Sequence, residues 1–382
     1  MTRVVITGTG LFTPAQAIDN AALVKTFNTW VEAENARWAE AIAAGEREPL
    51  QPSSEDFIVK ASGIHSRYVL DAEGILDPER MRPNLPARDD DALSIQAEMG
   101  VAAANEALQA AKVAAADIDL VIVGCSNLER AYPAVAVELQ AALGAGGHAY
   151  DMNVACSSAT FAIDAATNAI RAGSASRVLV VSPEICSAHL NFRDRDSHFI
   201  FGDACTAIVL EDEALATAES RFEVLGTRLV TRFSNAIRNN AGFLNRVTDS
   251  DPLGADKLFV QEGRRVFKEV CPLVAALIGE HLASLSLGGD DLSRLWLHQA
   301  NRHMNDLIAR RVLGRDPTPE EAPIILDRYA NTSSAGSIIA FHLHRGDLAA
   351  GALGWCVPSA RATVPAMSWC VAADGKGYRH DV

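Results

Sequence analysis

The sequence lacks the cysteine pattern of a disulfide framework or a zinc site. Its seven cysteines are odd in number and scattered, and no two of them form a Cys-x-x-Cys pair. Disulfide frameworks belong to oxidising compartments, and structural zinc sites need closely spaced ligand pairs. We therefore expect free thiols, a reducing cytoplasmic environment and no resident metal ion.

Long apolar runs and a leader segment are missing as well. A membrane-spanning helix needs roughly 18 to 20 consecutive apolar residues, and no run in the sequence approaches that length. The chain opens MTRVVITGTG, which predicts a strand followed by glycines, not the basic and apolar regions of a signal peptide. We expect a cytoplasmic protein without a membrane segment.

Positive charge is scarce compared with negative charge. The 34 Lys and Arg residues stand against 48 Asp and Glu residues, which leaves a net charge of −14. This balance disfavours non-specific binding to nucleic acid or to anionic membranes, although a local basic patch could still bind an acidic partner. With 382 residues, 49% of them hydrophobic, the chain is long enough for two packed halves.

Short β-branched segments alternate with alanine-rich segments along the chain. This alternation is typical of buried mixed or parallel sheets with helices on their faces, and so predicts the α/β class. We expect strands at residues 3–8, 119–125, 177–186, 204–211, 221–230 and 294–300, and helices at residues 92–111, 134–143, 158–173, 262–285 and 301–314.

A polar, acidic junction at residues 211–220 predicts a division into an N-terminal half, 1–215, and a C-terminal half, 216–382. Two regions of the first half are typical of insertions. Residues 28–56 are polar and helix-prone, and residues 71–91 are rich in proline and charge. Long excursions of this kind cap an entrance, line a subunit interface or are simply solvated, and the sequence leaves these alternatives open.

The stretch DMNVACSSATF, residues 151–161, places Cys156 among small residues just before a predicted helix. The free N–H groups and dipole at a helix N-terminus favour a thiolate over a thiol. Small neighbours also leave room for a substrate carbonyl group. The alternative is a buried structural cysteine, because free cysteine is among the most buried residue types.

Two further polar motifs lie in the second half. His298 ends a predicted strand in LWLHQANRHMND, residues 295–306, where a strand-to-helix turn would hold its ring rigidly. Asn331 precedes a run of small residues in RYANTSSAGSI, residues 328–338. Taken singly, His298 could be an ordinary core histidine, and the NTSS segment an ordinary N-cap and turn.

Taken together, the three motifs resemble the ketoacyl synthase III family of condensing enzymes, within the thiolase superfamily. That family carries a cysteine in a small-residue turn, then HQAN, then Asn-Thr-Ser, in this order. ASGIHSR (61–67) and FIFGDACTAIVLE (199–211) are similar to two more of its motifs. The resemblance spans residue 1 to about residue 350, apart from the insertions. It implies a thiolase-like five-layer αβαβα arrangement of two similar halves, normally as a homodimer.

The resemblance also implies a reaction, a decarboxylating Claisen condensation that initiates fatty acid biosynthesis. The Cys156 thiolate would take an acyl group from acyl-CoA. Malonyl-acyl carrier protein would then lose carbon dioxide while His298 and Asn331 donate hydrogen bonds that stabilise the enolate. The product would be a 3-oxoacyl-acyl carrier protein. The CoA thioester is a substrate here, and no metal or redox cofactor is expected.

Other positions are carried over from the family. Arg195 and Phe57 match residues that bind the CoA adenine, although the family often has tryptophan at the position of Phe57. Tyr132 matches an aromatic residue that closes the acyl pocket of the partner subunit. Arg302 and His303, directly after HQAN, are expected to contact the carrier protein. Each position also has an ordinary interpretation as a surface or packing residue.

Two other functions stay open from the sequence. A related acyl-CoA condensing enzyme would abstract an α-proton instead of decarboxylating, and Glu129 is the candidate carboxylate base. A non-catalytic partner subunit would have the same fold. The presence of Cys156, His298 and Asn331 together argues against such a scaffold.

The two insertions, with small residues such as Ser157 and Ser158, suggest a primer longer than acetyl, of medium chain length. The sequence leaves open both the exact acyl length and the carrier of the malonyl group, acyl carrier protein or CoA.

The C-terminal segment departs from the family, in which a glycine-rich loop completes the oxyanion hole. Here GWCVPSARATVPAMSWCV, residues 354–371, has no glycine after Gly354, and its two prolines fit a central strand poorly. A coding sequence for such a glycine loop, read one nucleotide later, can give Ser-Ala-Arg-Ala-Thr-Val, which is residues 359–364. We hypothesise a frameshift from around Gly354, with genuine divergence as the alternative.

Overall fold

The computed structural model describes residues 2–251, 254–357 and 366–373. Within these residues, nine strands form one curled mixed sheet in the order β11-β12-β13-β8-β1-β7-β6-β4-β5. In chain order they are β1 (Val4–Phe12), β4 (Leu120–Gly124), β5 (His148–Met152), β6 (Arg177–Ile185), β7 (Asp203–Asp212), β8 (Phe222–Val230), β11 (Leu292–Leu297), β12 (Leu353–Val357) and β13 (Ala366–Ala373).

The sheet has two arms that meet where β1 pairs with β8, at Val5 and Ile6. The first arm, β5-β4-β6-β7-β1, uses strands from the first half of the chain, and the second, β8-β13-β12-β11, uses strands from the second half. Each arm contains parallel pairs, β4 with β5 and β6 in one and β11 with β12 in the other. The expected division at 215/216 falls between β7 and β8. That the two halves are separate domains stays a prediction.

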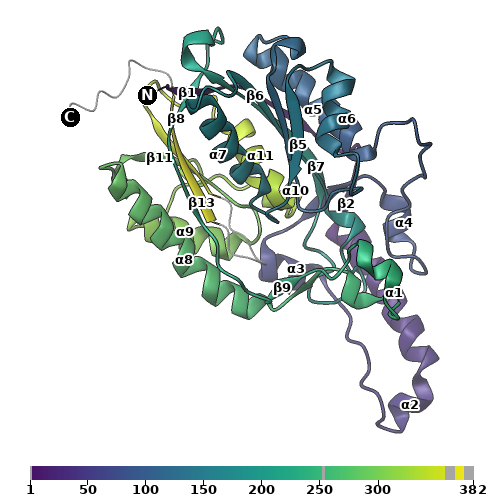
Figure 1. Cartoon of the computed structure of the whole chain (residues 1–382). Helices are drawn as coiled ribbons and strands as arrows, with labels where there is room; N and C mark the ends of the chain where they lie inside the picture. The colour runs from purple at the N-terminus through teal and green to yellow at the C-terminus, as the bar shows by residue number, and fades with distance from the viewer. Residues whose placement is uncertain (1, 252–253, 358–365, 374–382) are drawn as a thin grey trace.

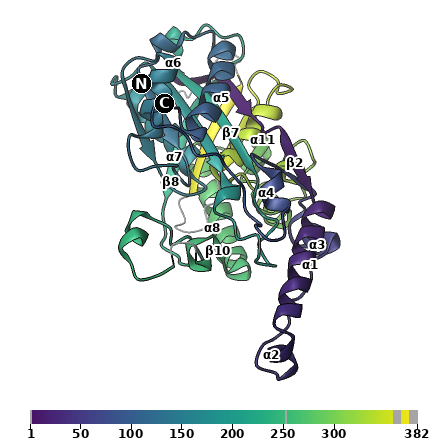
Figure 2. The same ribbon diagram turned by 90° about the vertical axis from the view of Figure 1, so that its right-hand side faces the viewer.

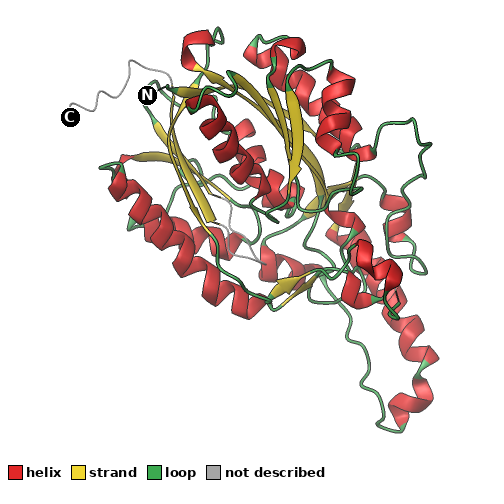
Figure 3. Cartoon of the chain, viewed as in Figure 1, coloured by secondary structure: helices red, strands yellow, loops and turns green. Residues whose placement is uncertain are grey.

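Helices cover the outer face of each arm and fill the space between the arms (Figures 1 and 3). On the first arm lie α5 (Ile95–Ala111) and α6 (Val135–Leu143), and on the second lie α8 (Gly263–Ser284) and α9 (Arg302–Leu313). Between the arms lie α7 (Ser158–Arg171) and α11 (Gly336–Leu343). The succession of layers is αβαβα, as the sequence predicts.

The hydrophobic core follows these layers, and β4 shows why. Its side chains alternate between faces, so Leu120 and Ile122 pack in the cluster around α7 while Val121 and Val123 pack in the cluster under α5 and α6. All four are buried. A strand covered by helices on both faces needs apolar residues at every position, which explains the continuous apolar run in the sequence.

The eleven predicted elements all form, with ends shifted by a few residues. Within the main sheet and its layers, β5, β12, β13 and α11 are absent from the sequence-based prediction, as are the short elements described below. The expectation that the C-terminal segment fits a central strand poorly is wrong for β13, which pairs with both β12 and β8. β13 begins after both prolines. The stretch that contains them, 358–365, lies outside the described residues.

The first insertion forms a helical extension that projects from the body (Figures 1 and 2). It consists of the outer part of α1 (Asn20–Arg37) and of α2 (Ala39–Ala43), and an extended segment returns to α3 (Glu55–Ser62). The second insertion contains α4 (Ala72–Leu76) followed by irregular chain. A role for either insertion at an entrance stays a prediction.

The remaining short elements are two antiparallel pairs of strands and one helix. The pairs are β2 (Gln16–Asp19) with β3 (Ser66–Val69) and β9 (Ile237–Arg238) with β10 (Val260–Gln261), and the helix is α10 (Leu326–Tyr329). None of the helices in the described ranges has the length and apolar character that a membrane crossing requires.

Candidate active site

Cys156 lies at the N-terminus of α7, as the sequence predicts. Ser157 is the N-cap residue, and the helix begins at Ser158. The preceding residue, Ala155, has a φ of +49°, a left-handed conformation that is strained for a residue with a Cβ atom. The Ser158 hydroxyl fixes this turn, since it accepts from the Val154 N–H at 2.8 Å and donates to the Ala155 carbonyl at 2.7 Å.

The other cysteines of the described chain differ from Cys156 in their burial. Of the six cysteines whose side chains the structure describes, five are buried and Cys156 is partly accessible, and all six are free thiols. Burial raises the pKa of Cys125, Cys186 and Cys205 well above the ordinary range, so these stay protonated. The accessible cysteine at a helix N-terminus is therefore the candidate nucleophile, and no group of three metal-ligating side chains occurs in the described part of the chain.

His298 follows β11 directly and is buried. The next residue, Gln299, fixes the turn through its side-chain amide. Its Oε1 accepts from the backbone N–H groups of Ile325 and Leu326 at 3.0 and 3.2 Å, and its Nε2 donates to the Leu297 carbonyl at 2.9 Å. Gln299 thus has a positioning role that the sequence motif alone did not reveal.

Asn331 is completely buried, between strained neighbours. Ala330 and Ser333 have φ values of +53° and +50°. The Asn331 Oδ1 accepts from the Ser333 N–H at 2.9 Å, whereas its Nδ2 group is buried and has no hydrogen-bond partner among the described residues. A buried amide donor without a partner is costly to the fold. It is suited to donate to a substrate carbonyl oxygen.

Two glycines bring these turns together. A Cβ atom on Gly336, just after the Asn331 turn, would lie 3.2 Å from the Gln299 Cβ, so the histidine and asparagine turns are in contact. On the other side, the Ser334 Oγ lies 3.2 Å from the Gly124 carbonyl oxygen. A Cβ on Gly124 would lie only 2.6 Å from the Ser158 carbonyl oxygen. The asparagine turn is thereby connected to the first residue of the nucleophile helix.

A cavity of about 440 Å³ opens beside the HQAN turn. Its walls include Phe199, Phe267 and Met304, and two cations of the first turns of α8, Arg264 and Lys268, also line it. The sequence analysis missed these two cations, although they stand at the start of a predicted helix. The predicted residue His303 lines the same cavity.

The two residues expected to bind CoA adenine lie in contact near this cavity. The Arg195 guanidinium carbon is 4.1 Å from the centre of the Phe57 ring, which is cation–π geometry. The Phe57 ring in turn packs edge-on against Phe199, a cavity residue, at 5.8 Å. The other docking candidate, Arg302, is exposed and lies 3.9 Å from the Asp306 carboxylate. That Arg195 and Phe57 bind CoA, and that Arg302 and His303 contact the carrier protein, stays a prediction.

Tyr132 and Glu129 lie on the loop between β4 and α6. The Tyr132 side chain is 84% exposed, so it closes no pocket of its own chain. The Glu129 carboxylate accepts from the Gln96 N–H in the first turn of α5 at 3.1 Å, and the Gln96 side chain accepts from the Glu129 N–H at 2.7 Å. Glu129 is thus bound to α5 and is poorly suited to act as a base at Cys156.

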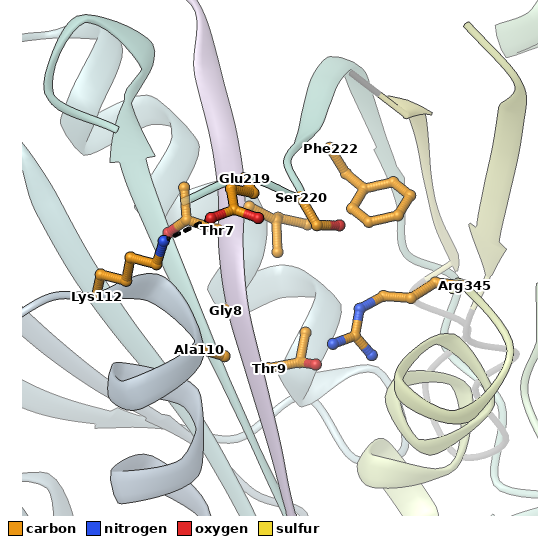
Figure 4. A pocket seen from close by; sticks show the side chains of 10 residues that line it. Thr7, Gly8, Thr9, Ala110, Lys112, Glu219, Ser220, Phe222 and Arg345 are labelled. Carbon is orange, nitrogen blue, oxygen red and sulfur yellow. Dashed lines mark hydrogen bonds and ion pairs between the residues drawn. The ribbon is translucent and has the colours of Figure 1, made fainter. Parts of the chain in front are cut away.

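A second cavity, of about 250 Å³, lies between β1, the end of α5 and Arg345 (Figure 4). Lys112 and Glu219 form an ion pair at 3.1 Å on one side of it, and the Arg345 guanidinium points toward Thr9 on the other. None of the site residues expected from the sequence lines this cavity. The candidate active site is therefore the one at the three motif turns.

Comparisons with known proteins show the family to which the chain belongs. Two profiles of 3-oxoacyl-(acyl carrier protein) synthase III, one of them for its C-terminal domain, match residues 150–232 and 282–356. The beta-ketodecanoyl-(acyl carrier protein) synthase of Pseudomonas aeruginosa is 63% identical over 331 residues, 87% of this chain and 95% of that protein. The beta-ketoacyl-(acyl carrier protein) synthase III of Allorhizobium ampelinum is 31% identical over 79% of this chain and 85% of its own.

Solved structures show the same fold at lower sequence identity. The 3-oxoacyl-(acyl carrier protein) synthase III of Aquifex aeolicus superposes with a TM-score of 0.74 at 22% identity, covering 97% of this chain and 99% of its own. The priming beta-ketosynthase of the R1128 polyketide pathway gives a TM-score of 0.76 at 23% identity, covering 99% and 98%. The thiolase-like fold expected from the sequence is thus confirmed.

Proposed function

Because the chain belongs to the 3-oxoacyl-(acyl carrier protein) synthase III family, an acyltransferase family of fatty acid biosynthesis, we propose that Cys156, His298 and Asn331 are its catalytic residues. The observation that carries this proposal is the meeting of the three motif turns, with the unpartnered Asn331 amide donor among them. The two alternative functions receive less support. Glu129, the candidate base of a non-decarboxylating enzyme, is hydrogen-bonded to α5. A non-catalytic subunit would not need Cys156, His298 and Asn331, and all three are present.

The reaction proceeds in two halves. In the first, the Cys156 sulfur attacks the thioester carbonyl of acyl-CoA, the carbon–sulfur bond to CoA breaks, and CoA leaves as the thiol after taking up a proton. In the second, the malonyl group of malonyl-acyl carrier protein loses carbon dioxide. The electron pair of the broken bond forms an enolate, to which His298 and Asn331 donate hydrogen bonds. The enolate carbon then attacks the acyl-cysteine and releases the Cys156 thiolate.

We assign a medium-chain primer of eight carbons. The relative from P. aeruginosa is named for a beta-ketodecanoyl product, which contains ten carbons, and condensation with a malonyl group adds two. The medium-chain primer expected from the sequence therefore agrees with the name of that relative. The cavity beside HQAN is the proposed entry for both thioesters, with Arg195 and Phe57 binding the CoA adenine.

The carrier protein is proposed to dock on the cations around this cavity. Arg264, Lys268 and His303 line it, and the exposed Arg302 is the first residue of α9, directly after HQAN. In a chain of net charge −14, a cluster of cations at one entrance is suited to an acidic carrier protein. A homodimer completes the proposal, with β5 as the pairing edge and Tyr132 reaching the acyl pocket of the partner subunit.

The frameshift hypothesis concerns residues outside the described ranges. Its support is that the C-terminal family profile matches up to residue 356, where the departure from the glycine loop begins. Resequencing the gene across codons 350–382 tests it. A reading frame shifted by one base should encode a glycine-containing loop and an aliphatic strand, and its absence would dismiss the hypothesis.

The catalytic assignment is tested one half-reaction at a time. The protein is incubated with acyl-CoAs of two to twelve carbons, and intact mass and peptide mapping should show a single adduct on Cys156, formed fastest with octanoyl-CoA. His298→Ala and Asn331→Ala should still be acylated but lose malonyl decarboxylation by about 10²–10³-fold, the usual effect of removing one preorganised donor. An adduct that persists in Cys156→Ala, or normal decarboxylation by both other variants, would refute the assignment.

A further inference from the structure

Glu184 is a carboxylate buried beside the active-site turns, and neither the sequence motifs nor the proposed reaction assigns it a role. It is the penultimate residue of β6 and is 1% exposed. No basic side chain of the described residues forms an ion pair with it. Its charge is therefore stabilised by hydrogen-bond donors alone.

These donors come from both halves of the chain. From the loop after β4, Ser126 donates its backbone N–H at 3.1 Å and its hydroxyl at 2.5 Å. From the asparagine turn, Ser334 donates its backbone N–H at 3.2 Å and its hydroxyl at 2.5 Å. The two serines are more than 200 residues apart in the sequence, and Glu184 joins them through one carboxylate group.

Each serine leads by short steps to a catalytic residue. Ser334 follows Asn331 by three residues, within the turn that positions its amide. On the other side, the Asn153 Nδ2 donates to the Ser126 carbonyl at 2.8 Å, and the Asn153 Oδ1 accepts from the Ala155 N–H at 3.0 Å. Ala155 is the strained residue directly before Cys156.

We propose that Glu184 is a positioning residue that holds the asparagine turn in register with the nucleophile turn. The inference rests on the proposed function, because it takes Asn331 and Cys156 as the catalytic residues that must be aligned. It adds a group that touches no substrate and acts through Ser334 and Ser126. Misplacing a reacting group by about 1 Å can lower a rate by about 10²-fold, so such a group has kinetic consequences.

The hydrogen bonds that the Glu184 carboxyl group accepts fit this role. Burial raises the pKa of its carboxyl group, while the four hydrogen bonds from Ser126 and Ser334 oppose that rise. A carboxylate accepts at both oxygens, which lets each serine donate both of its groups. A glutamine keeps the three bonds at Oε1, and its Nε2 can donate to the Ser126 hydroxyl, so Glu184→Gln is a conservative replacement.

The test compares four variants in the two half-reactions. Glu184→Ala and Ser334→Ala should lower malonyl decarboxylation by about 10–100-fold through kcat, with the KM for malonyl-acyl carrier protein little changed. Glu184→Gln should restore the rate to within a few-fold of the original. Ser126→Ala should instead slow acylation of Cys156 by octanoyl-CoA.

Glu211→Ala is the matched control for Glu184→Ala, because it makes the same chemical change at an equally buried carboxylate at the far end of β7, where Glu211 binds Arg177 at 2.9 Å. It should lower the melting temperature and leave both half-reactions unchanged. Should Glu184→Ala fail to fold, Ser334→Ala carries the test.

The outcomes separate the inference from the proposed function. Loss of decarboxylation in Asn331→Ala, together with normal rates in Ser334→Ala and Glu184→Ala, would overturn the inference alone. An equal reduction of both half-reactions in Glu184→Ala and Glu211→Ala, in step with their melting temperatures, would assign Glu184 a purely structural role. Normal decarboxylation in Asn331→Ala would instead refute the proposed function itself.

Discussion

Single residues of this chain tie its stability to pH, and His189 shows how. Its ring lies against Phe201 and Phe259, and burial lowers its pKa to about 4. Between about pH 6.5 and pH 4 the unfolded state therefore binds a proton that the folded state does not, and stability falls as the pH falls. Burial lowers the pKa of His198 to about 4 as well, with the same sign. Asp203 acts oppositely, because burial raises its pKa to about 6.

We expect His189→Leu to flatten this dependence. Urea unfolding at pH 7 and pH 5 should show that the variant loses about 2 kcal/mol less than the original protein on acidification, from the linkage of one proton. Both His189 ring nitrogens are buried without hydrogen-bond partners among the described residues, so leucine removes no such bond. Parallel pH curves for the two proteins would contradict the assignment of this proton to His189.

At the residue scale, the sequence points to the three proposed catalytic residues but not to the residues that hold their turns in place. Cys156, His298 and Asn331 stand in recognisable local contexts, so their surroundings within a few residues were informative. Gln299, Gly124 and Glu184 act through segments 25 or more positions away. No local pattern encodes such contacts.

At the scale of elements, the close approach of β4 to α7 fixes the start of the nucleophile helix. A Cβ atom at Gly124 would lie 2.6 Å from the Ser158 carbonyl oxygen, and backbone on both sides leaves little freedom to adjust. We expect Gly124→Ala to destabilise the fold by about 1–3 kcal/mol, the usual cost of overpacking, and to slow acylation of Cys156.

Gly279→Ala is the matched control for that substitution. It lies inside α8, where an added Cβ would have no neighbour within 4 Å, and alanine is the better helix former by about 0.5–1 kcal/mol. It should raise stability and leave acylation unchanged, as measured by denaturant unfolding and intact mass. A neutral Gly124→Ala would show that β4 and α7 can move apart freely.

Elements with a strong pattern were predictable, and elements with a weak pattern were not. The buried strands read as apolar runs because helices cover both of their faces. β5, sequence HAYDM, is a partly exposed edge strand with polar residues and carries no such run. α11 begins inside the small-residue segment after Asn331, so its first turn was taken for a loop, and β13 was obscured by the flanking prolines.

At the scale of the whole molecule, the proposed homodimer predicts that the exposed Tyr132 reaches the acyl pocket of the partner subunit. We expect sedimentation analysis to give twice the mass of the 40.7 kDa chain. In the homodimer, Tyr132→Ala should weaken the preference for octanoyl-CoA. A mixed dimer of Tyr132→Ala and Cys156→Ala subunits should regain that preference, because the only subunit with Cys156 then receives Tyr132 from its partner. A monomer, or a mixed dimer without recovery, would exclude this arrangement.

The order of the strands in the second arm constrains how this protein is made. β13, close to the C-terminal end of the chain, lies between β8 and β12, so the arm closes around a strand that the ribosome synthesises last. Until then, a nascent chain displays unpaired edges of β8 and β12, which invite pairing with other chains. The first arm faces no such delay, because its strands end at Asp212. Synthesis that stopped before β13 would thus yield a folded first arm joined to an aggregation-prone remainder, and the cell would meet such a product as a substrate for chaperones and proteases.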